Sequence, residues 1–330
     1  MFHMFHVKHS LTWRDNLTTQ RDPASHSETE IAQTTRPERA ICDYEGSNYQ
    51  AEFWSGQERD YEDQVERIAL RRLLPRRGAT LIDVGAGFGR LADLYAGYQR
   101  VVLADYSRSM LRQAQDRLGK NNPRFVFVAA NVYQLPFVDA VMDTAVMVRV
   151  AHHLTDVPAA LAELARIIRP SGCFIFEFAN KRNVKAILRY LLHRQSWNPF
   201  DPAPVEFVRL NYNFHPHWIE RNVDAVNLEV RSRLSVSHFR LPLFKKVVPL
   251  RILIGMDSAI QQTGKWWLLS PSGFLQLHKP GPSQPQPELL FRCPSCTGTD
   301  LRPADGCLEC TSCGKLWRVD DGLYDFKEPV

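Results

Sequence analysis

Apolar and polar positions follow two regular patterns along the middle of the chain. Between residues 60 and 75, five apolar residues recur at helical spacing and predict an amphipathic helix that ends before a proline: Tyr61, Val65, Ile68, Ala69 and Leu73. Short apolar runs at residues 81–84 and 100–104 predict buried strands. Residues 228–238 alternate as a half-buried strand does, and residues 273–278 indicate another strand.

A glycine-rich turn, Gly85-Ala86-Gly87-Phe88-Gly89, follows the strand at 81–84, and residues 91–98 are predicted to form the next helix. Alternate glycines let a backbone turn tightly and approach a ligand, and turn amides suit its anionic or polar groups. The strand at 100–104 ends in Asp105, where a ribose-binding carboxylate belongs. This pairing indicates a nucleoside-containing cofactor. The Gly-x-Gly-x-Gly spacing departs from the dinucleotide fingerprint and argues against a nicotinamide or flavin.

The segment 81–90 resembles the first motif of class I S-adenosylmethionine-dependent methyltransferases with a type 11-like core. The resemblance continues in family order over about residues 58–180. The matching segments are Asp105-Tyr106-Ser107 with Met110-Leu111, the third strand at 125–131, the turn at 135–137, the fourth strand at 142–150, the helix at 161–169 and the fifth strand at 173–178. It implies an α/β, doubly wound, Rossmann-like sheet of seven strands. Segments 228–238 and 273–278 would then be its sixth and seventh strands, an antiparallel edge pair.

The same resemblance implies S-adenosyl-L-methionine as cofactor and places the residues that bind it. The methionine pocket would be shaped by Asp83, Gly85, Ala86, Gly87 and Gly89. Asp105 would hold the ribose hydroxyls beside Tyr106 and Met110, Asn131 with Val132 would meet the adenine, and Arg149 would complete the pocket after the fourth strand. Many relatives carry Asp where this chain has Asn131, but an amide oxygen can also accept from an adenine amino group.

Composition divides the 330 residues into four regions. Residues 1–45 are polar and without period, so we expect a disordered leader. The methyltransferase domain is expected at 46–280, with substrate-lid insertions at 181–270. Residues 181–290 hold 15 Lys and Arg against 7 Asp and Glu, which suits either a nucleic-acid backbone or a lid over a small acidic or amphipathic substrate. The whole chain is only +5, so we favour the small molecule.

Two Cys-x-x-Cys pairs, Cys293 with Cys296 and Cys310 with Cys313, predict a structural Zn²⁺ site in a ribbon at residues 290–330, after a Pro-rich linker at 281–289. A segment this short needs metal to fold. Cys307 also stands at knuckle spacing from Cys310, but Gly314 favours the 310/313 pair because it can adopt positive φ.

After the second pair, Trp317 and Asp321-Gly322-Leu323 resemble the small zinc-ribbon activator subunits of tRNA, rRNA and release-factor methyltransferases. That likeness implies a ribbon that stabilises the methyltransferase sheet from within the same chain. A ribbon that merely caps the domain, or binds elsewhere, is the alternative.

Candidate catalytic residues are three histidines. His152 and His153 follow the fourth strand, where a general base or a packing pair could stand, and His215 lies in a second aromatic-histidine cluster. The motif for methylating planar amino groups is absent after that strand, so we expect O- or C-methylation of a small molecule. An RNA or protein methyltransferase with a built-in activator ribbon, or a non-catalytic cofactor-binding scaffold, are the alternatives.

The cellular setting follows from the cysteines and from hydropathy. Clustered cysteines suit a reducing compartment, so a cytoplasmic protein is expected. No apolar run approaches the ~18 residues of a membrane span. The sequence carries no signal for an oligomeric state.

Overall fold

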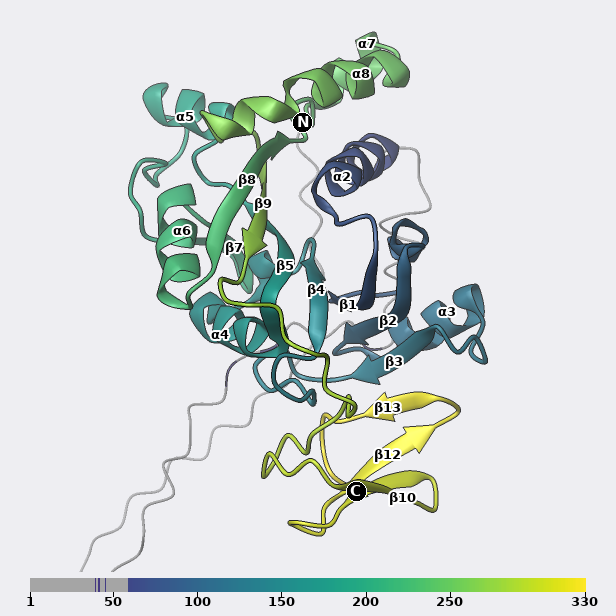
Figure 1. Ribbon diagram of the computed structural model, residues 1–330. Helices are drawn as coiled ribbons and strands as arrows, with labels where there is room; N and C mark the ends of the chain where they lie inside the picture. The colour runs from purple at the N-terminus through teal and green to yellow at the C-terminus, as the bar shows by residue number, and fades with distance from the viewer. Residues whose placement is uncertain (1–38, 40, 42–44, 46–58) are drawn as a thin grey trace, which may run out of the picture. The chain divides into compact units, whose positions relative to one another are not determined.

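The computed structural model describes residues 39, 41, 45 and 59–330 (Figure 1). Apart from those three positions, the expected leader at 1–45 lies outside the described residues. Within them, no helix is both long and apolar enough to cross a bilayer.

Seven strands form the central sheet in the order β3-β2-β1-β4-β5-β9-β8. Their bounds are β1 Gly78–Val84, β2 Tyr98–Asp105, β3 Phe125–Ala129, β4 Met142–Met147, β5 Ile168–Ala179, β8 Glu229–Val236 and β9 Ser272–His278. Strands β1 to β5 are parallel, and β9 is antiparallel to both β5 and β8. The α/β, doubly wound, Rossmann-like fold is therefore confirmed, with the two late segments as its antiparallel pair.

Helices cover both faces of this sheet. The helices are α2 Asp60–Leu73, α3 Arg108–Leu118, α4 Val157–Ile167, α5 Val184–Leu191, α6 Pro216–Ala225, α7 Pro242–Val247 and α8 Leu250–Ile260, with short 3₁₀ turns η2 Ala92–Tyr95, η3 Ala151–His153 and η4 Gln261–Lys265. Because successive side chains of a strand point to opposite faces, Leu81 joins one buried cluster with α2 and α3. Ile82 joins another cluster with α4 and α6.

The helix predicted at 91–98 is wrong in length. The chain forms only the 3₁₀ turn η2, because β2 already begins at Tyr98, which pairs with Gly78. The helix predicted at 161–169 instead begins at Val157, where Asp156 Oδ1 caps it by accepting from the Ala159 N–H at 3.0 Å. The fourth strand ends at Met147, before the residues expected to continue it to 150.

The C-terminal segment extends the same sheet, which then has eleven strands in order β10-β11-β12-β13-β3 and onward. Its strands are β10 Leu301–Ala304, β11 Cys307–Cys310, β12 Leu316–Asp320 and β13 Leu323–Asp325. Strand β13 pairs in parallel with β3, with Tyr324 opposite Val128. A separate hairpin, β6 Val205–Val208 with β7 Asn211–Asn213, stands outside this sheet.

Candidate functional site

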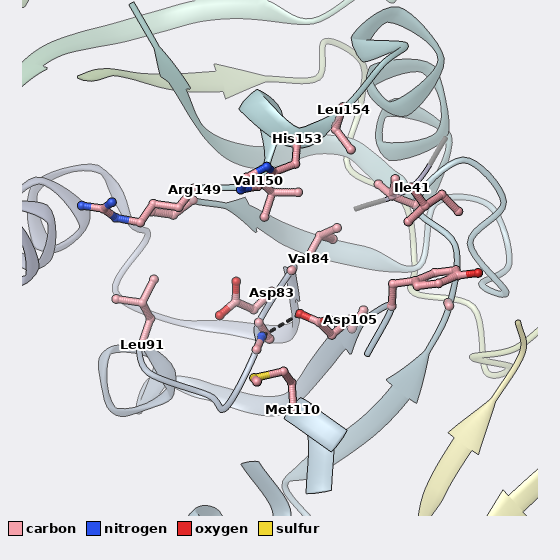
Figure 2. A pocket seen from close by; sticks show the side chains of 18 of the residues that line it. Ile41, Asp83, Val84, Leu91, Asp105, Met110, Arg149, Val150, His153 and Leu154 are labelled. Carbon is pink, nitrogen blue, oxygen red and sulfur yellow. Dashed lines mark hydrogen bonds between the residues drawn. The ribbon is translucent and has the colours of Figure 1, made fainter. Parts of the chain in front are cut away.

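A cavity lies at the carboxyl ends of β1, β2 and β4, where the strand order reverses (Figure 2). In open α/β sheets this switch point is where ligands bind. Of the residues predicted to bind cofactor, the cavity is lined by Asp83, Gly85, Ala86, Gly87, Asp105, Tyr106, Met110, Val132 and Arg149. Gly89 and Asn131 are not among the lining residues.

The glycine turn brings bare backbone to the cavity. Gly85 has φ of 73°, and a Cβ there would lie 2.1 Å from Val150 Cγ2. Gly87 has φ of 53°, and a Cβ on it would meet no heavy atom within 4 Å, so its missing side chain leaves open space. The turn therefore needs glycine for conformation at both positions, and it leaves room for a ligand at the second.

Asp105 is held in place by backbone amides at the end of β2. Its Oδ2 accepts from the Gly87 N–H at 2.8 Å, drawn as the dashed line in Figure 2, and its Oδ1 accepts from the Ser107 N–H at 2.9 Å. Each carboxylate oxygen can accept more than one hydrogen bond. The arrangement thus presents a fixed acceptor pair suited to vicinal hydroxyls.

Asp83 lies at the end of β1 and is only 3% exposed. Burial raises the pKa of this carboxyl to about 7, while the hydrogen bond from Tyr95 Oη at 2.8 Å and the nearby Arg90 oppose the rise. A cationic group entering the cavity would favour the ionised carboxylate.

The far end of the cavity, beyond Asp105, is formed by Ala130, Val132, Tyr133 and Leu135. Asn131 Oδ1 instead accepts from the Tyr133 N–H at 3.0 Å, so this side chain shapes the turn. Its contact with adenine stays a prediction. Ile41 also lines the cavity, although it belongs to the segment expected to be a leader. Neither Ile41 nor Tyr133 stood out in any sequence pattern.

Beside the glycine turn, the cavity borders a cluster of buried charges. Glu66 on α2 is fully buried and accepts from Arg149 Nε at 2.8 Å and from Arg90 Nη2 at 3.0 Å. Burial by itself would raise the pKa of Glu66, but the two arginines outweigh it and hold that pKa below its ordinary value. In the sequence, Glu66 is marked only as a charge next to Val65 and Ala69 on the apolar face of the helix, which was not enough to predict its role.

Arg149 is fixed at both its ends. Its backbone has φ of 62°, and its N–H donates to Glu177 Oε2 at 2.8 Å. Burial, together with Glu66, raises the pKa of Glu177. Arg240 completes the cluster, and burial and Arg149 lower its pKa. The arginine that lines the cavity therefore cannot move without disturbing the packing of α2 on the sheet.

Of the three predicted catalytic histidines, only His153 lines the cavity. Its Nδ1 lies 3.1 Å from the Leu210 carbonyl oxygen, which can only accept, so Nδ1 carries the proton and Nε2 keeps a lone pair. Burial lowers the pKa of His153. The ring of His152 packs against that of His153 with centroids 4.0 Å apart. Burial is the largest cause that lowers the pKa of His152 well below its ordinary value, and the neighbouring His153 is the next.

His215 stands elsewhere. Its Nδ1 caps α6 by accepting from the His217 N–H at 3.2 Å, and the residue is 7% exposed. Its catalytic role stays a prediction without support from the cavity lining.

In the C-terminal segment, the four predicted cysteines come together, with all their sulfurs within 4.8 Å of one another. The Sγ atoms of Cys293 and Cys313 are 3.7 Å apart, and those of Cys296 and Cys310 are 3.4 Å apart. Metal–sulfur bonds of about 2.3 Å in a tetrahedron give edges of about 3.8 Å. The donor set therefore fits a closed tetrahedral thiolate centre. Cys307 lies in β11, outside this group.

The two cysteine knuckles have the same backbone form. Thr297 follows Cys296 with φ of 64°, and Gly314 follows Cys313 with φ of 70°. Thr297 N–H donates to the Cys293 carbonyl at 2.8 Å, and Gly314 N–H donates to the Cys310 carbonyl at 2.7 Å. This repetition is what two ligand hairpins around one metal require.

The ribbon also contacts both loops that flank the cavity. Lys327 Nζ lies 4.5 Å from the ring centroid of Tyr106, and Arg108, on the helix after Asp105, pairs with the buried Asp325. The first residues of the ribbon support the other loop, since Arg292 N–H donates to the Pro136 carbonyl at 3.0 Å. Order in the ribbon is therefore coupled to the shape of the cavity.

Comparisons with known proteins agree with this geometry. Residues 82–176 match the family model described as a methyltransferase domain. The malonyl-[acyl-carrier protein] O-methyltransferase of Geobacter sulfurreducens is 36% identical over 122 residues, which are 35% of this chain and 45% of that protein. The ubiquinone/menaquinone biosynthesis C-methyltransferase UbiE of Paracoccus denitrificans is 33% identical over 132 residues, 38% of this chain and 52% of that protein. The chain thus spans about half the length of these relatives.

Among solved structures, one similar chain comes from the complex between the Haloferax volcanii Trm112 methyltransferase activator and a methyltransferase. It aligns over 71% of this chain and 96% of its own length, with 18% identity and a TM-score of 0.47.

Proposed function

We propose that this chain, which carries a methyltransferase domain at its centre, transfers the methyl group of S-adenosyl-L-methionine to a small-molecule acceptor by O- or C-methylation. The observation that carries the proposal is the cavity in which the glycine turn after β1 faces Asp105 at the end of β2. That pair offers bare backbone to one half of a nucleoside cofactor and a fixed acceptor to its ribose.

The residues around the cavity fit S-adenosylmethionine in three parts. Asp83 with the turn at 85–87 would surround the methionine part, whose cationic groups suit a buried carboxyl. Asp105 would accept from the ribose hydroxyls, and Val132 with its neighbours would cover the adenine. The cofactor supplies an activated methyl group on sulfur. The protein must then align the acceptor, exclude water and, where needed, remove a proton.

His153 is the residue we propose for proton removal or for positioning the acceptor. It borders the cavity, and its neutral form with a lone pair on Nε2 can accept a proton. His152 would hold the ring of His153 from behind.

A small acceptor is favoured by a second cavity of about 950 Å³. Its lining is largely apolar, from α5, residues 238–241 and residues 269–271, with Arg240 among the polar groups. Arg240 also faces the cluster of Arg149 and Glu66 that borders the first cavity. An apolar body with an acidic or polar group would match this lining.

We further propose that Cys293, Cys296, Cys310 and Cys313 bind a structural Zn²⁺, which holds the ribbon against the cofactor domain. Four thiolates leave no open position, so a catalytic metal is not the natural interpretation. The pairing of β13 with β3 supports a second candidate function, an RNA or protein methyltransferase whose activator ribbon is built into the chain.

The test is transfer of radiolabelled methyl from S-adenosylmethionine into cell lysate, fractionated into RNA, protein and organic-extractable material. Asp105→Ala would abolish transfer, whereas Asp116→Ala, at an exposed position of α3, would leave it unchanged. Label in the organic fraction is expected. Label in RNA or protein would reject the small acceptor in favour of the second candidate. Binding of cofactor without any transfer would reject the enzyme and leave a scaffold.

A further inference from the structure

Helix α5 presents its apolar face to the outside. Val184, Leu188, Leu191 and Leu192 recur at helical spacing and are 50–62% exposed, whereas the small Ala186 is the buried residue of this helix. In a helix packed on a domain the apolar stripe normally faces the core. This stripe therefore has no covering element in the described part of the chain.

A second exposed apolar surface belongs to α7, α8 and the turn that follows η4. Phe244, Ile252 and Met256 are exposed, while Leu253 and Asp257 face inward. Trp266 and Trp267 are 72% and 64% exposed. Side chains of this size rarely stand so far out unless something covers them.

The two surfaces belong to one face of the molecule. Residues of α5 line the same cavity of about 950 Å³ as Phe239, Arg240, Leu241 and Phe244. In Figure 1, α5, α7 and α8 lie along one end of the sheet, and the yellow ribbon lies at the other. We refer to residues 181–194 and 239–268 together as the α5–α8 face.

The charge of this face is strongly one-sided. Of its ten basic residues, Lys181 and Arg240 are buried and Lys245 pairs with Glu62. The other seven are Arg182, Lys185, Arg189, Arg194, Lys246, Arg251 and Lys265. Asp257 is the one acidic residue of the face, and it is fully buried, where it accepts from Tyr61 Oη at 2.6 Å. The exposed apolar side chains are therefore interspersed with positive charge.

We propose that the α5–α8 face docks on an anionic lipid membrane surface. Amphipathic helices with basic borders lie in the bilayer interface, tryptophans favour the headgroup level, and each basic residue adds attraction to anionic lipid. In this arrangement the face lies on the membrane surface.

Other partners fit the face less well. A nucleic acid would satisfy the charges but leave the aliphatic stripe of α5 in water. A second copy of the face would bring seven basic residues against seven, and the one acidic residue of the face is buried. The proposal does not rest on methyl transfer, and its test needs no activity.

The experiment is co-sedimentation of the full-length, zinc-loaded protein with vesicles. Vesicles of phosphatidylcholine with about one third phosphatidylglycerol should retain the protein, and pure phosphatidylcholine should retain much less. The double variant Lys185→Glu/Arg251→Glu removes two exposed charges of the face. It should weaken binding by about 30-fold or more, since each basic residue near an anionic surface contributes about fivefold.

The matched control is Arg221→Glu/Arg318→Glu, which makes the same charge change at exposed positions outside the face. It should lose less than about threefold from long-range charge alone. Trp266→Ser/Trp267→Ser should weaken binding to both kinds of vesicle without changing the thermal midpoint, because both side chains are exposed.

Three results would overturn the proposal. These are absence of binding to anionic vesicles, an equal loss in the control and face variants, and dimers in solution that the tryptophan variant converts to monomers. Face-dependent binding of RNA with no binding to vesicles would also reject the membrane.

Discussion

Asp83 gives the sharpest test of the electrostatics at the cavity. Its carboxyl is buried at the end of β1, accepts one hydrogen bond from Tyr95, and has a pKa raised from 3.8 to about 7. The perturbation is Asp83→Asn, which keeps an oxygen for Tyr95 to donate to but cannot ionise.

Ionisation of Asp83 opposes folding, because the pKa of its carboxyl is higher in the folded protein than in the unfolded chain. The free energy of unfolding therefore has its full value below about pH 4, where Asp83 is neutral in both states, and it falls as the pH rises to about 7. The full loss above pH 7 is about 4 kcal/mol, and roughly 2 kcal/mol of it falls between pH 5.5 and pH 8. In Asp83→Asn this pH-dependent loss disappears.

The assay is urea unfolding of wild type and Asp83→Asn without cofactor, at pH 5.5 and pH 8 and at constant Zn²⁺. The difference in free energy of unfolding between the variant and wild type should shift by about 2 kcal/mol in favour of the variant when the pH rises from 5.5 to 8. Comparing the two proteins at each pH cancels the titration of all other groups. Parallel pH profiles would show that Asp83 ionises normally in the fold and would refute the reasoning.

Three other substitutions test the remaining parts of the site. Cys310→Ser, or a strong chelator, should unfold the ribbon, change the fluorescence of the buried Trp317 and lower cofactor affinity severalfold, since the ribbon contacts both flanking loops. A chelated protein with unchanged affinity would uncouple the two. Glu66→Gln should destabilise the protein by about 3–5 kcal/mol in thermal or urea unfolding, because Arg149 stays buried without its carboxylate; a loss under 1 kcal/mol would contradict the buried pair. His153→Ala should reduce turnover by about 10²-fold or more with cofactor affinity unchanged, and normal turnover would remove His153 from the mechanism.

Much of this fold could be predicted because local patterns and global packing agree. The stripe from Tyr61 to Leu73 forms α2, and the late segments at 228–238 and 273–278 supply the antiparallel strands. The turn at Gly85 and Gly87 with Asp105 was recognisable because backbone conformation and close approach restrict residue choice there. The cysteine pairs were equally readable, because ligand spacing is fixed by metal geometry.

What the sequence concealed depends on tertiary contacts. The helix expected at 91–98 shrinks to η2 because the sheet needs Tyr98 for β2. Ile41 lines the cavity, although it belongs to a segment whose sequence has no periodic pattern of apolar residues. Glu66 stands among the apolar residues of α2, and only the fold reveals that Arg90 and Arg149 pair with it inside the protein.

The measurement that tests the central claim most directly is calorimetric titration of S-adenosylmethionine into the zinc-loaded protein, with Asp105→Ala and Asp116→Ala beside wild type. One molecule should bind per chain, Asp105→Ala should weaken binding at least about tenfold through loss of a charged acceptor, and Asp116→Ala should bind as wild type does. Absence of binding to wild type, or equal affinity in Asp105→Ala, would contradict the assignment of this cavity to S-adenosylmethionine.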